Sequence, residues 1–269
     1  MPDAEAALQL ARAKALLVET VRDAGALALQ MQGTRLREWT KGGSSPVSEA
    51  DIAANDLIEA RLRDATPDYG WLSEESVDDT SRLGKALTWI VDPIDGTRGY
   101  LAGRDDWCVS VALVRDAVPV LAAVFAPVTD EMFLAQRHAG ATLNGRTLQA
   151  NSGTTIDFGR MAGPKPMVER LTDRGRDITL YPRIASLALR LCRVADGVLD
   201  AAFAGGASKD WDLAAADLIV HEADGRLTEI EGDPILYNRR DVTHGTLIAA
   251  GRDRHADLVQ RFKDRPLHW

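Results

Sequence analysis

Apolar residues recur every three to four positions along residues 4–31, and this spacing predicts a long amphipathic helix. Gly33 is expected to end it, because glycine readily takes the left-handed conformation found just after a helix. A second helix is predicted to start at Ser48, with Asp51 three positions after this cap and a Gly/Ser-rich loop over residues 40–46 before it. The apolar face of the second helix comprises Ile52, Leu57, Ile58 and Leu62.

Short β-rich segments dominate the next part of the chain. Residues 70–74 and 89–91 predict two strands, each running into acidic residues. The runs 109–114 and 118–126 predict a hairpin, because a short polar turn joins them. Between the first two strands, residues 76–85 are polar without apolar periodicity and are predicted to form a mobile flap. The meander continues with two further strands and a turn: residues 131–135, residues 141–143 and Asn144-Gly145.

The pattern changes near residue 150. Residues 151–166 are rich in Gly, Thr and Pro, so we place a boundary there, between an N-terminal α+β domain (1–150) and a C-terminal α/β domain (151–269). A loop is predicted over the small residues 204–208, and Gly225 is expected to end a helix. The predicted helices are residues 186–195, 212–223 and 254–262, and the predicted strands are residues 198–203, 226–230 and 246–249.

Composition excludes several classes of protein. The 269 residues carry a net charge of −8, which argues against a partner that is a nucleic-acid polymer or an anionic membrane surface. No apolar stretch is long enough to cross a membrane, and the N-terminus lacks the pattern of a signal peptide, so a cytoplasmic location is expected. Cys108 and Cys192 lie in apolar runs and are predicted to be buried free thiols.

Acidic side chains at the ends of predicted elements are the main candidates for chemistry. Glu74 ends one strand, Asp92 and Asp95 end the next, and Asp51 and Asp212 lie in the first turns of helices. Each acid alone has a structural alternative as a helix cap or a solvated turn. Together they fit a crevice where carboxylates hold cations that activate a water, beside helix N–H groups that bind phosphate. The pattern therefore suggests metal-assisted phosphoryl chemistry.

Four motifs, in order along nearly the whole chain, resemble those of the inositol monophosphatase superfamily of Mg²⁺-dependent, lithium-sensitive phosphatases. Residues 89–97, which contain Asp-Pro-Ile-Asp-Gly-Thr, resemble its first signature. Residues 211–216 resemble the second signature, and the family's Glu-Ala-x-Gly follows at residues 222–225. Residues 45–51 and 72–76 are similar to its N-terminal motif and its acidic strand end. The resemblance implies an αβαβα sandwich of the inositol monophosphatase and fructose-1,6-bisphosphatase type, of class α/β.

The resemblance also implies a role for each acidic residue. Glu74, Asp92 and the backbone carbonyl of Ile94 would hold a first Mg²⁺. Asp92 would bridge to a second Mg²⁺, which Asp95 and Asp212 complete. Glu74 could also reach a third, more hydrated ion. Mg²⁺ keeps several waters, so one is available to attack a phosphate.

Other residues are expected to orient the reactants. By the same resemblance, Thr97 would help to orient the attacking water, with Asp51 hydrogen-bonded behind it. The backbone N–H groups of Gly96 and Thr97 would hold the phosphate. Lys209 and Asp212 could contact the substrate, although a solvated loop lysine is an alternative for Lys209. The chain departs from the family at Gly99, where an Asn or Glu is frequent, and this departure concerns the substrate and none of the metal ligands.

The family comprises branches with different substrates. Residues 106–113 and 187–197 look most like bacterial 3′(2′),5′-bisphosphate nucleotidases, which convert adenosine 3′,5′-bisphosphate to AMP and phosphate. Alternatives are an inositol-1-monophosphatase, a histidinol-phosphate or fructose-1,6-bisphosphate phosphatase, or a non-enzymatic regulator that binds a phosphorylated metabolite on the same fold. The expected partner is a small phosphorylated metabolite, and a homodimer is common in this family.

Overall fold

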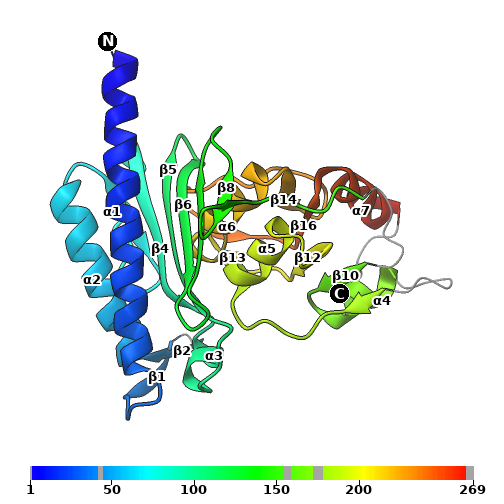
Figure 1. Cartoon of the computed structure of the whole chain (residues 1–269), viewed down its shortest axis with the longest axis horizontal. Coiled ribbons are helices and arrows are strands. Elements are labelled where there is room, and N and C mark those ends of the chain that lie inside the picture. Colours follow the sequence, from blue (N-terminus) through cyan, green and yellow to red (C-terminus); the bar gives the residue numbers. More distant parts are fainter. Residues whose placement is uncertain (1, 42–44, 154–158, 172–177, 265–269) are drawn as a thin grey trace.

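The computed structural model describes residues 2–41, 45–153, 159–171 and 178–264, which form five layers (Figure 1). Two long helices cover one face of a large sheet, two further helices lie between this sheet and a smaller one, and the last two helices cover the far face of the smaller sheet. In this order the helices are α1 (Pro2–Met31), α2 (Glu49–Ala65), α5 (Leu187–Ala195), α6 (Asp210–Glu222), α4 (Lys165–Leu171) and α7 (Arg252–Asp264). The predicted αβαβα sandwich is confirmed.

The large sheet has seven strands in sequence order, and only its first pair is parallel. Its strands are β3 (Gly70–Ser73), β4 (Leu87–Asp95), β5 (Cys108–Arg115), β6 (Val118–Ala126), β7 (Glu131–Gln136), β8 (Ala141–Leu143) and β9 (Arg146–Thr147). Along β4, Trp89 and Val91 pack toward α1 and α2, while Ile90 faces the core around α5 and α6. Because both faces are covered, β4 is buried over its whole length, including the two aspartates near its end.

The smaller sheet has the order β11-β10-β12-β16-β14. Its strands are β10 (Arg160–Ala162), β11 (Thr179–Leu180), β12 (Ala201–Ala204), β14 (Gly225–Glu229) and β16 (Leu247–Gly251). One apolar cluster around α5 and α6 includes Ile90 of the large sheet and Leu247 of the smaller one. The boundary expected near residue 150 lies between β9 and β10, and independent folding of the two parts stays a prediction.

The predicted loop over residues 40–46 is wrong in part. β1 (Glu38–Lys41) pairs antiparallel with β2 (Ser45–Ser48), whereas residues 42–44 lie outside the described residues. The Gly/Ser composition masked the strands on either side, in which Trp39 pairs with the fully buried Val47. The capping box of the following helix is confirmed, since Ser48 caps α2 and Asp51 accepts the Ser48 backbone N–H.

The start and the end of α6 also differ from expectation. The helix begins at Asp210, where the chain leaves a two-stranded ladder formed by β13 (Ser208–Lys209) and β15 (Thr243–His244). At the other end Asp224, with φ of 62°, takes the left-handed conformation expected of Gly225. Gly225 instead starts β14, where a Cβ would lie 2.7 Å from a Val220 methyl group. Glycine is needed there for close packing.

Residues 76–85, expected from their composition to be mobile, are anchored at Arg82. The segment contains the short helix η1 (Ser81–Gly84), whose Arg82 is fully buried. The Arg82 guanidinium pairs with Asp78 and donates to Asn238 Oδ1 at 2.8 Å and to the Arg239 carbonyl at 3.0 Å. These bonds tie the segment to a part of the chain more than 150 residues away. Arg82 therefore fixes the segment, which the polar composition alone did not reveal.

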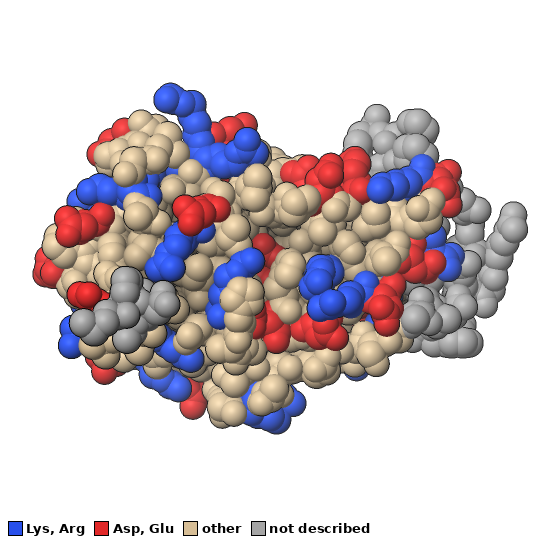
Figure 2. Space-filling view, turned by 90° about the horizontal axis from the view of Figure 1, so that it is seen from above, with Lys and Arg blue, Asp and Glu red and all other residues tan. Residues whose placement is uncertain are grey.

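Two expectations from composition can be compared with the described residues. Cys108 and Cys192 are buried free thiols, as predicted. Among the helices of the described residues, none combines the length and the apolarity that a membrane span requires. On the face seen in Figure 2, basic and acidic side chains are interleaved, and no patch of a single sign dominates.

Candidate metal and phosphate site

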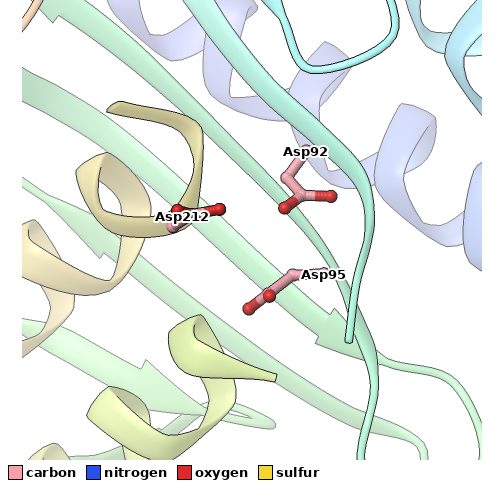
Figure 3. Close-up of side chains that lie close together, drawn as sticks. All are labelled: Asp92, Asp95 and Asp212. Carbon is pink, nitrogen blue, oxygen red and sulfur yellow. The ribbon is translucent and has the colours of Figure 1, made fainter. Parts of the chain in front are cut away.

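Three carboxylates converge where the end of β4 meets the start of α6. Asp92, Asp95 and Asp212 place one carboxylate oxygen each within 4.8 Å of one another (Figure 3). The pairing of β4 with β5 shifts register between Asp92 and Asp95. Pro93, which has no backbone N–H, sits in this irregular stretch. Such an irregularity re-aims side chains, and here both aspartates lie near Asp212 (Figure 3).

These carboxylates line a cavity of about 330 Å³ that contains nearly all the predicted site residues. Its lining consists of Pro46, Glu74, Asp92, Ile94, Asp95, Gly96, Thr97, Arg98, Arg183, Ala185 and Asp212. The five residues expected to hold metal are all included. Lys209 is not, because its Nζ donates to Thr243 Oγ1 at 2.7 Å. The backbone N–H of Lys209 instead fixes Asp212, donating to its Oδ2 at 2.7 Å.

Burial and mutual repulsion make this cluster a poor place for carboxylates without cations. Desolvation, followed by the charges of Asp212 and other acids, raises the pKa of Glu74 to about 8. Desolvation and Asp95 raise the pKa of Asp212 to about 7. The pKa of Asp92 is also raised well above its usual range by burial and by Glu74. Buried like charges are costly unless they are paired or bind metal, so this donor set fits hard divalent cations.

Asp95 is held in place by the start of α5. The Ser186 hydroxyl and the Ala188 backbone N–H each donate to Asp95 Oδ2 at 2.6 Å. Ser186 also caps α5, because its Oγ accepts the Leu189 N–H at 2.9 Å. Two donors fix the carboxylate against rotation, and the helix N-terminus favours its negative charge. The short helix cap thus connects the C-terminal part of the chain to the metal cavity.

Thr97 and Asp51 form the hydrogen-bonded pair expected from the sequence. The Thr97 hydroxyl lies 3.3 Å from Asp51 Oδ1 and 3.1 Å from the Ile94 carbonyl, and both oxygens can accept its proton. Asp51 Oδ2 in turn accepts the Ser48 N–H at 2.8 Å and the Ser48 hydroxyl at 2.6 Å. Burial raises the pKa of Asp51 to about 6 despite these bonds. The capping box of α2 therefore also positions a hydroxyl at the cavity.

Gly96 makes the turn between β4 and α3 (Thr97–Leu101) possible. Its φ is 94°, a left-handed conformation that favours glycine. A Cβ at this position would also lie 2.9 Å from the Ser186 nitrogen and 3.0 Å from the Asp106 carbonyl. Only glycine lets β4 turn so tightly against the start of α5, which keeps Thr97 at the cavity wall.

Two basic residues near this cavity were not singled out from the sequence, Arg183 and Arg190, whereas Arg98 had the same two interpretations as Lys209, a contact to a substrate phosphate or a solvated loop residue. Arg183 also lines a second cavity, of about 440 Å³, that contains Arg190 and Lys165. The lining of this second cavity consists of Ala162, Gly163, Pro164, Lys165, Leu180, Tyr181, Arg183, Ile184 and Arg190. Three of the described residues that line this second cavity are basic, and none of them is acidic.

Arg190 is the most unusual of these cations. Its Nε is buried and has no hydrogen-bond partner among the described residues. Desolvation lowers its pKa, and the nearby negative charge of Asp95 partly offsets this effect. Arg190 follows the Ser186 cap by one helical turn, and this spacing is the one signal in the sequence that could have placed it near Asp95.

The layered α/β fold, with carboxylates that converge between the end of a strand and the start of a helix, is typical of proteins that bind phosphate groups with the help of metal ions. The model of the inositol monophosphatase family matches residues 4–266, and the chain belongs to this family. Members are phosphoric monoester hydrolases that use Mg²⁺. The family expectation from the sequence is thus confirmed.

Individual relatives agree with this assignment. The chain is 38% identical to an inositol-1-monophosphatase of Rhizobium meliloti over 84% of this chain and 86% of that protein. It is 36% identical to the Nus factor SuhB of Xylella fastidiosa over 81% of this chain and 82% of that protein. The structure of the extragenic suppressor protein suhB from Bartonella henselae superposes with a TM-score of 0.82 at 27% identity, covering 94% of this chain and 98% of that one.

Proposed function

We propose that this phosphatase acts on a substrate with two phosphate groups, and that it is a 3′(2′),5′-bisphosphate nucleotidase that releases phosphate and AMP. The observation that carries the proposal is the basic cavity around Arg190, which shares Arg183 with the carboxylate cavity. A substrate whose reacting phosphate lies at the carboxylates could extend its second phosphate past Arg183. Inositol monophosphate has no second anion to use that cavity.

The proposed metal ligands are those expected from the family resemblance. Glu74, Asp92 and the Ile94 carbonyl would hold one Mg²⁺, and Asp92, Asp95 and Asp212 would hold another, with a third ion near Glu74. Their convergence on one cavity supports this assignment. Bound Mg²⁺ neutralises charge on the phosphate and makes a bound water more acidic.

The remaining residues would bind and orient. The Thr97 hydroxyl, hydrogen-bonded to Asp51, would form a hydrogen bond with the attacking water, either as donor or as acceptor. The phosphate would lie against the backbone of Gly96 and Thr97. Lys209, proposed from the sequence as a substrate contact, would act mainly through its backbone bond to Asp212. The water oxygen bonds to phosphorus as the P–O bond to the leaving alcohol breaks, and a proton from the water ends on that alcohol.

The basic cavity is well suited to a second phosphate. Guanidinium groups bind phosphate through paired N–H donors, and Arg190 has a buried Nε that lacks a partner among the described residues. Burial strengthens such a contact, because few waters screen it.

The test is a substrate panel measured with the wild type and with Arg190→Gln. The panel contains adenosine 3′,5′-bisphosphate, inositol 1-phosphate, histidinol phosphate and fructose 1,6-bisphosphate. We expect the highest kcat/KM for the bisphosphate nucleotide. Arg190→Gln should lower that value by about tenfold or more, the loss expected for a charge-assisted bond, while changing inositol 1-phosphate turnover by less than about threefold. Arg63→Gln on α2, an exposed arginine paired with Glu59, is the control.

The second candidate is inositol-1-monophosphatase, the activity for which the Rhizobium relative is named. A preference for inositol 1-phosphate, with equal effects of Arg190→Gln on all four substrates, would overturn the nucleotidase proposal and favour this candidate. Inhibition by lithium, a cytoplasmic location and a homodimer are further expectations from the sequence and stay predictions.

A further inference from the structure

A larger cavity lies at the opposite end of α6 from the carboxylates. Its volume is about 760 Å³, within the range of small-molecule sites and more than twice that of the metal cavity. Its walls come from α6, α7, β6 and β14, the turn after β7, and the segment following β14. No role in phosphoryl transfer requires it, since none of its lining residues lines the carboxylate cavity.

One part of this far cavity is basic. Arg226 lies close enough to both His221 and His255 that its charge acts on the titration of each. Arg137 and His138 add further nitrogen donors to the lining, whereas Arg252, which also lines it, is paired with Asp224 at 2.7 Å. Cations gathered around one cavity repel each other, and an anion placed between them would relieve this repulsion.

The two acids of the cavity already have partners. Asp217 accepts the Tyr237 hydroxyl at 2.9 Å and lies 2.9 Å from His221 Nδ1. Glu222 accepts the backbone N–H groups of His138 and Gly140, both at 2.8 Å. These carboxylates are therefore occupied by protein donors. Despite burial, the hydrogen bond to Asp217 and the charge of Asp217 raise the pKa of His221, which favours the imidazolium form, whose Nε2–H can donate to an anion.

Most of the remaining lining is apolar. It comprises Val118, Pro119, Leu218, Leu227, Pro234, Ile235, Leu236 and Ala256. Leu236 is 41% exposed, a high value for a large aliphatic side chain, and Ile235 beside it is buried. An apolar wall next to convergent basic groups is the arrangement expected of a site for an organic molecule with one acidic group.

We propose that this cavity is a second ligand site, which binds a small organic anion with an apolar body and is coupled to the metal cavity through α6. The acidic group would lie against Arg226 and His221, and the apolar body against Leu218 and Leu236. Helix α6 carries Asp212 in its first turn and His221 near its end, about 14 Å apart along the helix axis. Because α6 is buried along this length between the two sheets, it transmits a displacement at one end to the other.

Binding is tested with anilinonaphthalene sulfonate, a fluorescent aromatic anion, on the folded full-length protein. We expect one dye molecule per chain, and affinity lowered about tenfold or more in Arg226→Gln, the loss expected for a charge-assisted bond. Ala256→Trp, at an exposed lining position of α7, should fill the cavity and abolish binding. Ala60→Trp, at an exposed position of α2, is the matched control and should bind dye like the wild type. Wild-type affinity in both cavity variants, or no binding by the wild type, would overturn the site.

Coupling is tested by calorimetric titration of Mg²⁺ with and without saturating dye. We expect the dissociation constant for Mg²⁺ to change at least about threefold, and the dye affinity to change by the same factor in the presence of Mg²⁺. In Ala256→Trp the dye should leave Mg²⁺ binding unchanged. Equal Mg²⁺ affinity with and without bound dye would overturn the coupling. Neither experiment uses turnover, so its outcome is independent of the proposed substrate.

Discussion

Binding of Mg²⁺ should release protons in a pH-dependent amount, because the carboxylates of the cavity are partly protonated without cations. Glu74, with a pKa of about 8, holds about 0.9 proton at pH 7, and Asp212, with a pKa of about 7, holds about 0.5. Ligation requires both to ionise, so these two groups release about 1.4 protons per chain at pH 7. Asp92, whose pKa is also raised, can only add to this number.

The release should fall as the pH rises. At pH 9 Glu74 and Asp212 together retain about 0.1 proton, so their contribution drops by about 1.3 protons between pH 7 and pH 9. Since protons and cations compete for the same oxygens, the affinity for Mg²⁺ should rise over this interval. Isothermal titration calorimetry of Mg²⁺ binding in buffers of different ionisation enthalpy measures the number of protons released directly. This number is the slope of the observed binding enthalpy plotted against the ionisation enthalpy of the buffer.

A matched variant separates the two groups. Glu74→Gln removes the larger contribution and should lower the release at pH 7 by about 0.9 proton. Release of less than about half a proton at pH 7 by the wild type, or release that does not change between pH 7 and pH 9, would refute the reasoning that burial and like charges raise these pKa values.

Two further predictions concern stability. Burial, Arg226 and His221 lower the pKa of His255 to about 4, so on acidification the unfolded chain binds a proton at this histidine before the folded chain does. The stability that His255 contributes should therefore be lost as the pH falls from about 6.5 toward 4, by up to about 3 kcal/mol. Urea unfolding at several pH values should show a shallower decline in the free energy of unfolding for His255→Gln than for the wild type. Ser186→Ala removes both the cap of α5 and a hydrogen bond to Asp95, so the free energy of unfolding should fall by about 2–4 kcal/mol. Ser186→Thr, which keeps a hydroxyl, should retain most of the wild-type stability. Equal stability of the wild type and both variants would contradict the double role of Ser186.

The sequence predicted those features that depend on local chemistry. The carboxylates at the end of β4 and the start of α6 were identifiable because strand ends and helix starts carry recognisable residues, such as the Ser48 and Asp51 capping box. Their convergence followed from the family resemblance. The individual elements α1, β4 and β6 were also predictable, because their segments are rich in apolar residues, whereas the layered arrangement followed from the family resemblance.

The remaining features depend on contacts between distant parts of the chain. Arg82 fixes the segment predicted as a flap through Asn238, and no local pattern marks that pair. Arg183 reaches the metal cavity from an irregular segment, so neither periodicity nor a motif identified it. Lys209 was expected to contact substrate with its side chain, but in the structure that side chain bonds to Thr243.

The central claim is that this chain hydrolyses phosphomonoesters with Mg²⁺ held by the carboxylate cavity. The most direct measurement is release of phosphate from the four-substrate panel, with Mg²⁺ or with a chelator, by the wild type and by Asp92→Asn. Asparagine keeps the size of the side chain and an oxygen that can accept the Ile94 N–H, so the variant should remain folded by circular dichroism. We predict release only with Mg²⁺ and a loss of at least about a hundredfold in the variant. Turnover that is independent of Mg²⁺, or an Asp92→Asn protein close to wild-type activity, would contradict the account.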